Sequence, residues 1–292
     1  MTPEEYAALQ AAITAVAARY VGRFGSLFVN PFLTVAQWLG LLELLFPQIV
    51  ESRRQAAELG RRFYDSQRAI NHPQLPRHDV YLETYDFKRF VKDMDPARER
   101  MSRETAPQDA LTNLQLQATR VVENAGRQQI IHALKDDPTP NILKGWARVA
   151  TGRETCAFCL MLISRGPVYT NASTGGLNLI DEEAIRRSWA YEDDDVSDQM
   201  EEWHPGCDCL VVPVFKSKAW PGEKEADRAS DLWADATKEA RRILRDEPGK
   251  LYYSAKEKKW LPTTLNRETI NVLRRRLTAG EITMTELTAL AA

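Results

Sequence analysis

The 292-residue sequence lacks several features that would assign it to a specialised class of protein. It has only four cysteines, 14 glycines and 15 prolines. So few cysteines exclude a disulfide-rich scaffold, and the modest glycine and proline content excludes a collagen-like or low-complexity chain. Hydrophobic residues make up 43% of the chain and charged residues 27%. This composition is ordinary for a globular protein with a substantial core.

The chain also lacks a strong excess of charge of either sign. It holds 39 Lys and Arg against 41 Asp and Glu, a net charge of −2. General DNA-binding proteins usually carry a large basic excess, so the composition does not demand a nucleic acid partner. The charge is unevenly spread, because residues 181–202 hold ten acidic residues against two arginines while residues 216–292 hold 16 basic against 12 acidic. A local basic surface is therefore compatible with the near-neutral net charge of the whole chain.

No secretory signal or membrane-spanning run is apparent. The first residues are acidic and polar, whereas a secretory signal begins with basic residues and a short apolar run. We therefore expect the protein to be made in a cytoplasm. Residues 24–42 carry no charge, but Asn30 and Pro31 interrupt them, and a spanning helix needs about 20 predominantly apolar residues. We expect a buried hairpin here and no stable membrane insertion. The number of large apolar residues further predicts an exposed docking patch anchored by Phe32 and Trp38.

Helical periodicity dominates most of the sequence. Thr2, Pro3 and Glu5 have the pattern of a capped helix start, and a buried stripe is expected at Tyr6, Leu9, Ile13, Val16 and Tyr20. Pro47 is expected to end a second helix, and residues 70–80 form a loop with His72 and His78 on the surface. Further helices are predicted within residues 49–69, 81–134, 142–149, 226–244 and 266–277.

These patterns predict a mainly α protein with a small α+β Cys/His module. We place a helical region at residues 1–140, the module at 141–215 and a helical tail at 216–292. The short apolar run 209–215 predicts a strand within the module.

All four cysteines lie in two tight pairs, and one of the four histidines lies beside the second pair. The pattern is C-x2-C followed by H-x2-C-x-C, formed by Cys156, Cys159, His204, Cys207 and Cys209. Two such knuckles can complete a tetrahedral zinc site, and thiolates select zinc over calcium or magnesium. Five candidates compete for four places. We favour the four cysteines, with His204 either beside the metal or in place of one sulfur.

Other interpretations of the motif remain open. The cysteines can be reduced, buried residues that pack a small module, or they can form a disulfide after release from the cell. A Cys–His protease would use Cys156 or Cys159 as nucleophile and His204 as base. The H-x-E and P-C-x-x-C signature of a zinc deaminase is absent. No convincing catalytic set emerges, so we expect a protein that is not an enzyme.

Two segments around the motif carry a family resemblance. Residues 146–169 (WARVATGRETCAFCLMLISRGPVY) and 203–215 (WHPGCDCLVVPVF) resemble the core of the phage Mu F-like minor head proteins, in the form common among tailed phages of actinobacteria. The resemblance is close over residues 140–220 and loose over the helical N-terminal region. The motif positions that carry over are the five Cys and His residues, framed by Trp146, Arg148, Arg165, Gly166 and Tyr169, with Trp146 and Arg148 on a helix.

The resemblance implies a structural minor capsid protein of the virion, assembled in the host cytoplasm. Such proteins associate with portal and capsid proteins during head morphogenesis and influence genome packaging or ejection. Two rival functions are a head maturation protease or other capsid-associated enzyme, and a virion protein that binds packaged DNA. The second rival would use the basic tail with Tyr252, Tyr253 and Trp260. We favour a solvated helix surface for that stretch and its lysines, Lys256, Lys258 and Lys259.

Overall fold

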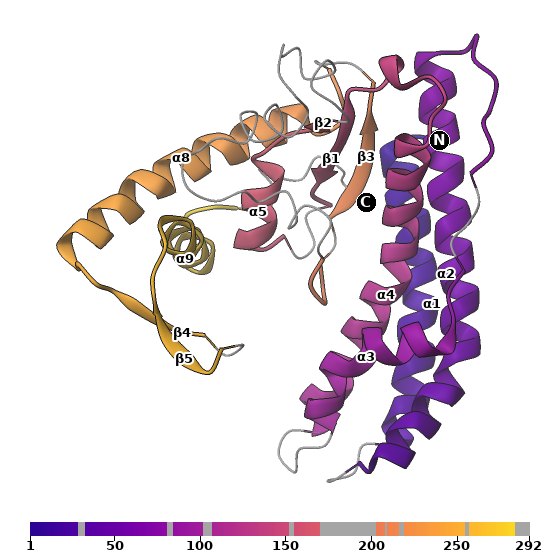
Figure 1. Ribbon diagram of the computed structural model, residues 1–292, viewed down its shortest axis with the longest axis horizontal. Coiled ribbons are helices and arrows are strands. Elements are labelled where there is room, and N and C mark those ends of the chain that lie inside the picture. The colour runs from indigo at the N-terminus through magenta and orange to yellow at the C-terminus, as the bar shows by residue number, and fades with distance from the viewer. Residues whose placement is uncertain are drawn as a thin grey trace.

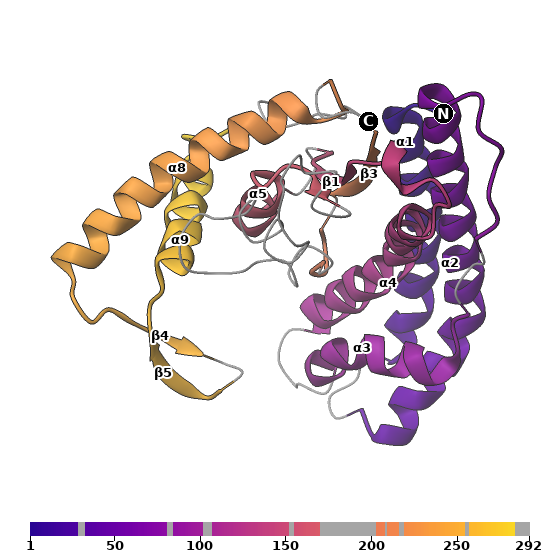
Figure 2. The same cartoon turned by 45° about the horizontal axis from the view of Figure 1, so that its top comes forward.

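The computed structural model describes residues 1–28, 33–80, 84–101, 107–151, 155–169, 203–207, 209–215, 219–254 and 257–283. Figures 1 and 2 show an upright helical bundle on one side and a small central sheet beside it. Two further helices and a hairpin lie beyond the sheet. The protein is mostly helical, with small sheets and a Cys/His cluster, which confirms the predicted fold class. The proposed domain boundaries stay a prediction.

The bundle contains α1 (Pro3–Gly25), α2 (Val35–Asn71), α3 (Phe87–Met101) and α4 (Pro107–Lys135). Helices α1, α2 and α4 pack against one another, and α3 packs against α2 and α4 at the lower end of the bundle (Figure 1). A single 3-10 turn, η1 (Ser26–Phe28), follows α1.

Helix α1 begins as predicted but buries a different face. Thr2 Oγ1 accepts from the backbone N–H of Glu5 at 3.2 Å, and the Glu5 carboxylate accepts from the Thr2 N–H at 2.8 Å. This reciprocal capping box satisfies two backbone donors. The predicted stripe is wrong in part, because Leu9 and Val16 are exposed. The buried side chains are mostly small or polar, and this lets neighbouring helices approach closely: Tyr6, Ala7, Gln10, Thr14, Ala17 and Val21.

Pro47 does not end a helix, contrary to the prediction. Helix α2 runs through it, starting from a Thr34 cap whose Oγ1 accepts from the Gln37 N–H at 3.2 Å. Pro47 and Glu43 both lie on the exposed side, so the carbonyl that loses its helical partner faces solvent. Packing against α1 and α4 holds the other side of the helix together.

The expected docking patch in residues 24–42 is wrong for its main anchor. Trp38 is only 2% exposed and belongs to the core of the bundle, while Phe32 lies outside the described residues. Leu27 and Val35 of the same segment are exposed. Trp38 is covered because it lies on the side of α2 that faces the other bundle helices. Among the described residues, no helix is both long and apolar enough to cross a membrane.

Helices α2 and α4 touch at a pair of glycines. A Cβ atom added to Gly60 would lie 2.6 Å from the carbonyl oxygen of Gly126, and one added to Gly126 would lie 2.9 Å from the hydroxyl of Tyr6. Real Cβ contacts are not this short, so both positions require glycine. Arg127 directly follows this close crossing, so the crossing fixes where its side chain starts.

A buried polar network joins the top of the bundle to the loop after α2. The carboxylate of Asp137 accepts from Tyr64 Oη at 2.6 Å and from Arg68 Nε at 2.6 Å. Arg68 also donates to the carbonyl of Pro76 at 2.7 Å. His78, predicted at the surface, is largely buried beside this network. Burial would raise the pKa of Asp137, but the hydrogen bonds from Arg68 and Tyr64 outweigh it and the pKa is lowered.

The central module is a three-stranded antiparallel sheet with one short helix. Its strands are β1 (Gly145–Val149), β2 (Val168–Tyr169) and β3 (Leu210–Val214), in the order β2-β1-β3, and α5 (Ala157–Ile163) packs on it. The strand predicted in residues 209–215 is confirmed. The helix predicted at 142–149 is wrong, because it is a 3-10 turn, η2 (Pro140–Ile142), followed by β1. Every residue of β1 is buried, and periodicity cannot distinguish so short a buried strand from a helix.

The tail contains α8 (Glu223–Asp246) and α9 (Leu265–Thr278), close to the predicted bounds. Between them lies an antiparallel hairpin, β4 (Leu251–Ser254) and β5 (Lys259–Pro262). The expected helical surface over this stretch is therefore wrong. Its aromatic residues favour strands, and Tyr253 pairs directly with Trp260. One core cluster joins the top of the bundle, the central module and the α8–α9 pair, and a second fills the rest of the bundle.

Candidate metal centre

The first pair of cysteines lies at the start of α5. Cys156 is the N-cap residue, and its Sγ accepts from the backbone N–H of Cys159 at 3.4 Å. A cap residue and the third residue of a helix lie on the same side of the first turn, so both sulfurs face one region. The spacing C-x2-C thus sets this half of the site locally.

The second half of the site is a tight turn. The N–H of Cys207 donates to the carbonyl of His204 at 3.1 Å, and Gly206 has a φ of 80°. Pro205 and Gly206 occupy the two central positions that suit such a turn. Cys209 follows and leads directly into β3. Because β3 pairs with β1 and α5 also packs on β1, the two halves of the motif meet.

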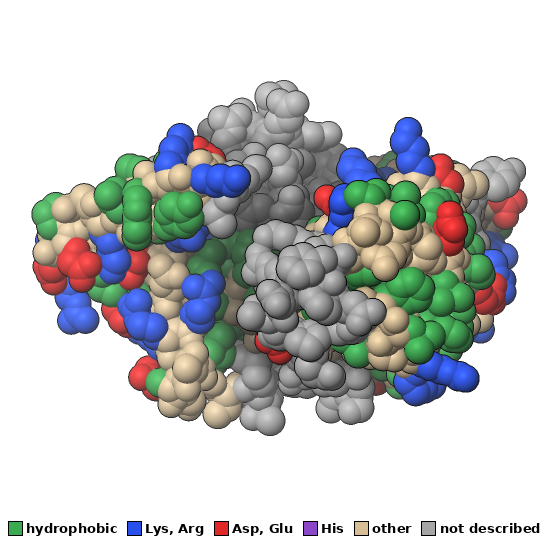
Figure 3. Space-filling model, turned by 90° about the horizontal axis from the view of Figure 1, so that it is seen from below, with side chains coloured by type: hydrophobic (Ala, Val, Ile, Leu, Met, Phe, Trp, Pro, Cys, Tyr) green, Lys and Arg blue, Asp and Glu red, His purple; other side chains and the backbone are tan. Residues whose placement is uncertain are grey.

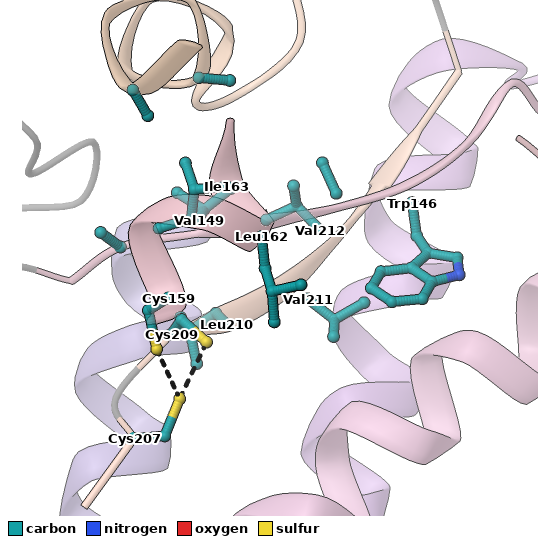
Figure 4. Close-up of a cluster of buried hydrophobic side chains, with 14 of the residues drawn as sticks. Trp146, Val149, Cys159, Leu162, Ile163, Cys207, Cys209, Leu210, Val211 and Val212 are labelled. Atoms are coloured by element: carbon teal, nitrogen blue, oxygen red, sulfur yellow. Dashed lines mark hydrogen bonds between the residues drawn. The ribbon is translucent and has the colours of Figure 1, made fainter. Parts of the chain in front are cut away.

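The structure brings all five predicted ligand residues together. Their ligand atoms form two overlapping triads, Cys156–Cys159–His204 and Cys159–Cys207–Cys209, and within each triad all atoms lie within 4.8 Å of one another. Figure 4 shows the sulfurs of Cys159, Cys207 and Cys209 converging. Cys159 Sγ lies 3.3 Å from Cys207 Sγ, which lies 3.1 Å from Cys209 Sγ. His204 Nε2 lies 3.0 Å from Cys156 Sγ and 3.7 Å from Cys159 Sγ.

These distances fit a zinc ion after a small expansion. Sulfurs on a tetrahedral zinc with bonds of about 2.3 Å stand about 3.8 Å apart. The observed sulfur separations are somewhat shorter, yet far longer than the bond of about 2.05 Å in a disulfide. All four cysteines are free. The donor set is soft, closely spaced and mostly buried, so the cluster could bind a metal such as zinc. Cys159 is the residue that both triads share.

Close contacts within the cluster shift the pKa values of its residues in opposite directions. Hydrogen bonds with Cys159 and His204 lower the pKa of Cys156 to about 4, and the contact with Cys156 raises the pKa of His204 to about 9. Contact with Cys156 and Cys207 raises the pKa of Cys159. Contacts with Cys159 and Cys207 hold the pKa of Cys209 well below its usual value. These directions favour thiolates at Cys156 and Cys209, whereas Cys159 and Cys207, whose pKa values are raised, must still lose their protons when a metal binds.

Two buried arginines flank the thiolates. Arg148 Nη1 donates to Cys209 Sγ at 3.7 Å from β1. Arg127 of α4 donates to the carbonyl of Cys207 at 2.7 Å and to that of Cys209 at 3.1 Å. Both guanidinium groups lie over the ring of Trp203, at 4.3 Å for Arg148 and 5.2 Å for Arg127. Their positive charge offsets the negative charge that a tetrathiolate zinc centre carries.

The framing residues named by the resemblance take structural positions. Arg148 reaches the cluster, whereas Trp146 lies on the same strand away from the sulfurs (Figure 4). Trp146 and Arg148 are on a strand, not on a helix as expected. Arg165 lies over the ring of Trp233 at 5.0 Å, and Gly166 lies in the turn after α5 with a φ of 67°. The Tyr169 backbone is in β2, and its side chain lies outside the described part.

Sequence reasoning missed Arg127 and Trp203. Trp203 directly precedes the second knuckle and enters the sequence interpretation only as part of the family pattern. Arg127 lies 80 residues from the turn that it contacts. The sequence pattern that could have identified Arg127 is a charged residue next to a glycine inside an apolar helical stripe. Such a signal marks a buried cation without showing what it pairs with.

The cluster has a closed side and a more accessible side. Cys159, Cys207 and Cys209 are buried, while Cys156 and His204 are partly exposed. The buried side suits a structural metal, since such sites are fully coordinated by protein ligands. The exposed pair also has the separation of a thiol nucleophile and its base. The arrangement therefore favours a metal site over a Cys–His nucleophilic pair, although it has the geometry for both.

Comparison with known proteins agrees with a phage origin. The family model described as VG15 protein matches residues 1–236. The Gene 15 protein of Mycobacterium phage L5 is 50% identical over 307 aligned residues, covering the whole of both chains. The Gene 15 protein of Mycobacterium phage D29 is 51% identical over 287 residues, covering 96% of this chain and all of the relative. No solved structure matches.

Proposed function

Since the chain belongs to the VG15 protein family, and is similar over its length to phage Gene 15 proteins, we propose that it is a minor capsid protein acting in head morphogenesis of a tailed phage. The resemblance of residues 146–169 and 203–215 to Mu F-like minor head proteins supports this role. The proposed partners are portal and capsid proteins, and the proposed location is the virion, after assembly in the host cytoplasm.

A structural zinc at the Cys/His cluster is part of this proposal. The observation that carries it is the convergence of five soft ligands from two segments of the module. They meet where α4, β1, α5 and β3 come together, with Arg127 and Arg148 against the same cluster. A metal there would hold the start of α5 to the segment that leads into β3. It would supply folding free energy rather than an open coordination position.

Co-sedimentation tests the assembly role most simply. The purified, reduced chain would be mixed with portal-only and with shell-only particles of the phage that encodes it. We expect it to sediment with one of these particles and to be present in few copies in purified virions. Failure to bind either particle, together with absence from virions, would contradict the proposal.

A matched pair of variants links the cluster to incorporation. Cys159→Ser removes the sulfur shared by both triads and should abolish incorporation into particles. Asp235→Asn changes only an exposed ion pair with Lys238 on α8 and should incorporate normally. Equal incorporation of both variants would show that the cluster has no part in assembly.

The second candidate is a capsid-associated Cys–His enzyme, favoured by the 3.0 Å distance between Cys156 Sγ and His204 Nε2. Two features support the structural role instead. Cys159 Sγ also lies close to the same nitrogen, and the other ring nitrogen of His204 meets only the carbonyl of Pro205 among its described hydrogen bonds. We expect His204→Ala to weaken the fold without removing any turnover. Cleavage of a shell or portal protein that is lost in a folded His204→Ala variant would favour the enzyme.

A further inference from the structure

The β4–β5 hairpin presents an exposed apolar face. It projects away from the rest of the molecule beyond α8 and α9 (Figures 1 and 2). The register pairs Leu251 with Pro262 and Tyr253 with Trp260, so these four side chains share one face. All four are exposed, with 52% of Leu251, 52% of Tyr253 and 65% of Trp260 accessible. The rings of Tyr253 and Trp260 lie edge to face, 5.7 Å apart.

The opposite face of the hairpin is held against α9. The Arg267 guanidinium of α9 lies 3.4 Å from the centre of the Tyr252 ring. At the base of the hairpin, the Thr263 N–H donates to the Lys250 carbonyl at 2.8 Å. Lys250 Nζ also lies 3.4 Å from the buried carboxylate of Glu268. These contacts fix the orientation of the hairpin. The face with Tyr253 and Trp260 therefore stays turned outward rather than folding back onto the helix.

The hairpin and α9 form the basic part of the tail. Residues 250–278 contain eight Lys and Arg against two Glu, whereas α8 has nearly balanced charge. Glu268 is fully buried beneath Lys250 and Arg275, so it neutralises little at the surface beyond them. Figure 3 views the molecule from below and shows Lys and Arg side chains, with Asp and Glu among them, on the part formed by α8, α9 and the hairpin. An anionic partner matches this surface.

Lys258, at the tip of the hairpin, is a second indication of an anionic partner. Its φ of 52° lies in the left-handed region, which favours glycine. A lysine there places an exposed cation at the end of the hairpin, next to the aromatic face. Replacing it with glycine removes the charge while relaxing the backbone, so the fold does not suffer from the substitution.

We propose that the β4–β5 hairpin binds single-stranded nucleic acid, with bases stacked on Tyr253 and Trp260 and phosphates held by the Lys and Arg of the hairpin and α9. Exposed aromatic rings beside cations suit unpaired bases, because every base offers a flat π-face and every nucleotide a phosphate. A duplex hides its base faces and offers these rings nothing to stack on. A neutral apolar partner would leave the surrounding charge unmatched.

The test uses the full-length, reduced and zinc-treated chain with fluorescein-labelled 20-mers of dT and of U, a 20-base-pair duplex and polyglutamate. Anisotropy would be followed over a salt series. We expect the single strands to bind more tightly than the duplex, to quench tryptophan fluorescence, and to weaken steeply with salt. The ratio between dT and U identifies DNA or RNA as the preferred strand, and either result supports the site. If polyglutamate displaced a bound strand at an equal concentration of negative charge, binding would depend on charge alone and the proposal would be overturned.

Three variants place the binding on the hairpin. Trp260→Leu should weaken single-strand binding about tenfold, since stacking contributes about 1–3 kcal/mol per base. Lys258→Gly should lower the salt slope by about one charge. Lys238→Ala, on exposed α8, is the control and should change neither quantity. Absence of binding at low salt, or equal affinity for Trp260→Leu and the unaltered chain, would overturn the proposal. Far-UV circular dichroism and the unfolding midpoint of each variant would show that its fold is unchanged.

Discussion

The Nη2 atom of Arg127 donates to the carbonyl oxygen of Cys207 at 2.7 Å, across 80 residues of sequence. This bond joins α4 of the bundle to the turn that carries Cys207 and precedes Cys209. The same guanidinium reaches the Cys209 carbonyl, and Arg148 reaches the Cys209 sulfur. The candidate metal centre is therefore built into the junction between bundle and sheet.

The first prediction concerns the charge of these arginines. Arg148→Met removes the cation nearest to Cys209 Sγ while retaining most of the side-chain volume. Because a tetrathiolate centre is anionic, zinc affinity should fall about 10- to 100-fold. Competition with a chromophoric chelator would measure it. Arg54→Met, which alters only exposed ion pairs with Glu51 and Glu58, should leave the affinity unchanged.

Arg148 is buried, so its loss could also weaken the fold without reference to metal. Urea unfolding of the metal-free protein would separate the two effects. A loss of stability that is the same with and without zinc would show that Arg148 supports packing and does not stabilise the metal.

The second prediction concerns the glycine crossing of α2 and α4. Gly60→Ala and Gly126→Ala should each destabilise the protein by about 1–3 kcal/mol, the usual cost of forcing an extra carbon into a packed contact. Gly40→Ala is the control, since a Cβ there meets nothing within 4 Å. It should be neutral or stabilising because alanine favours the helix. Urea denaturation would measure all three, and similar effects at positions 40 and 60 would contradict the close approach.

The third prediction is a pH dependence at Asp137. Its folded-state pKa is lowered by Arg68 and Tyr64, so its contribution to stability is complete above the unfolded pKa of about 3.9 and is lost as pH falls through the folded value. Asp137→Asn should cost about 3 kcal/mol at neutral pH, because it leaves Arg68 buried without its counter-charge. The difference from the unaltered chain should shrink below pH 4.

Asp235→Asn provides the comparison for that measurement. Asp235 forms an exposed pair with Lys238, and such pairs contribute little. Its unfolding curve should follow that of the unaltered chain at both neutral and acid pH. If Asp137→Asn behaved in the same way, the buried network would not have the role assigned to it.

Features set by neighbouring residues were predictable from the sequence. The Thr2 cap, the end of α4 before Asp136 and the bounds of α8 and α9 all depend on signals within a few residues. The Cys/His cluster was also predictable, because its two knuckles have distinctive spacings. The family resemblance alone places both knuckles in one module.

Features decided by tertiary contacts were not predictable. Pro47 stays inside α2 because the bundle packs on the opposite side, and Trp38 is buried by helices distant in sequence. Residues 145–149 form a strand because β2 and β3 pair with them on both sides. Arg127 could not be assigned to the cluster, since nothing in its local sequence indicates a partner 80 residues away. The sheet and the arginine contacts arise from the same long-range packing.

The central claim is that the cluster of five Cys and His residues holds one zinc ion, with four of them as ligands. The most direct measurement is the zinc content of freshly purified, reduced protein by elemental analysis, with X-ray absorption at the zinc edge to count sulfur neighbours. We predict about one zinc per chain with three or four sulfurs at about 2.3 Å, and loss of that zinc in Cys159→Ser. Fresh reduced protein without zinc, or zinc bound only through oxygen and nitrogen, would contradict the account.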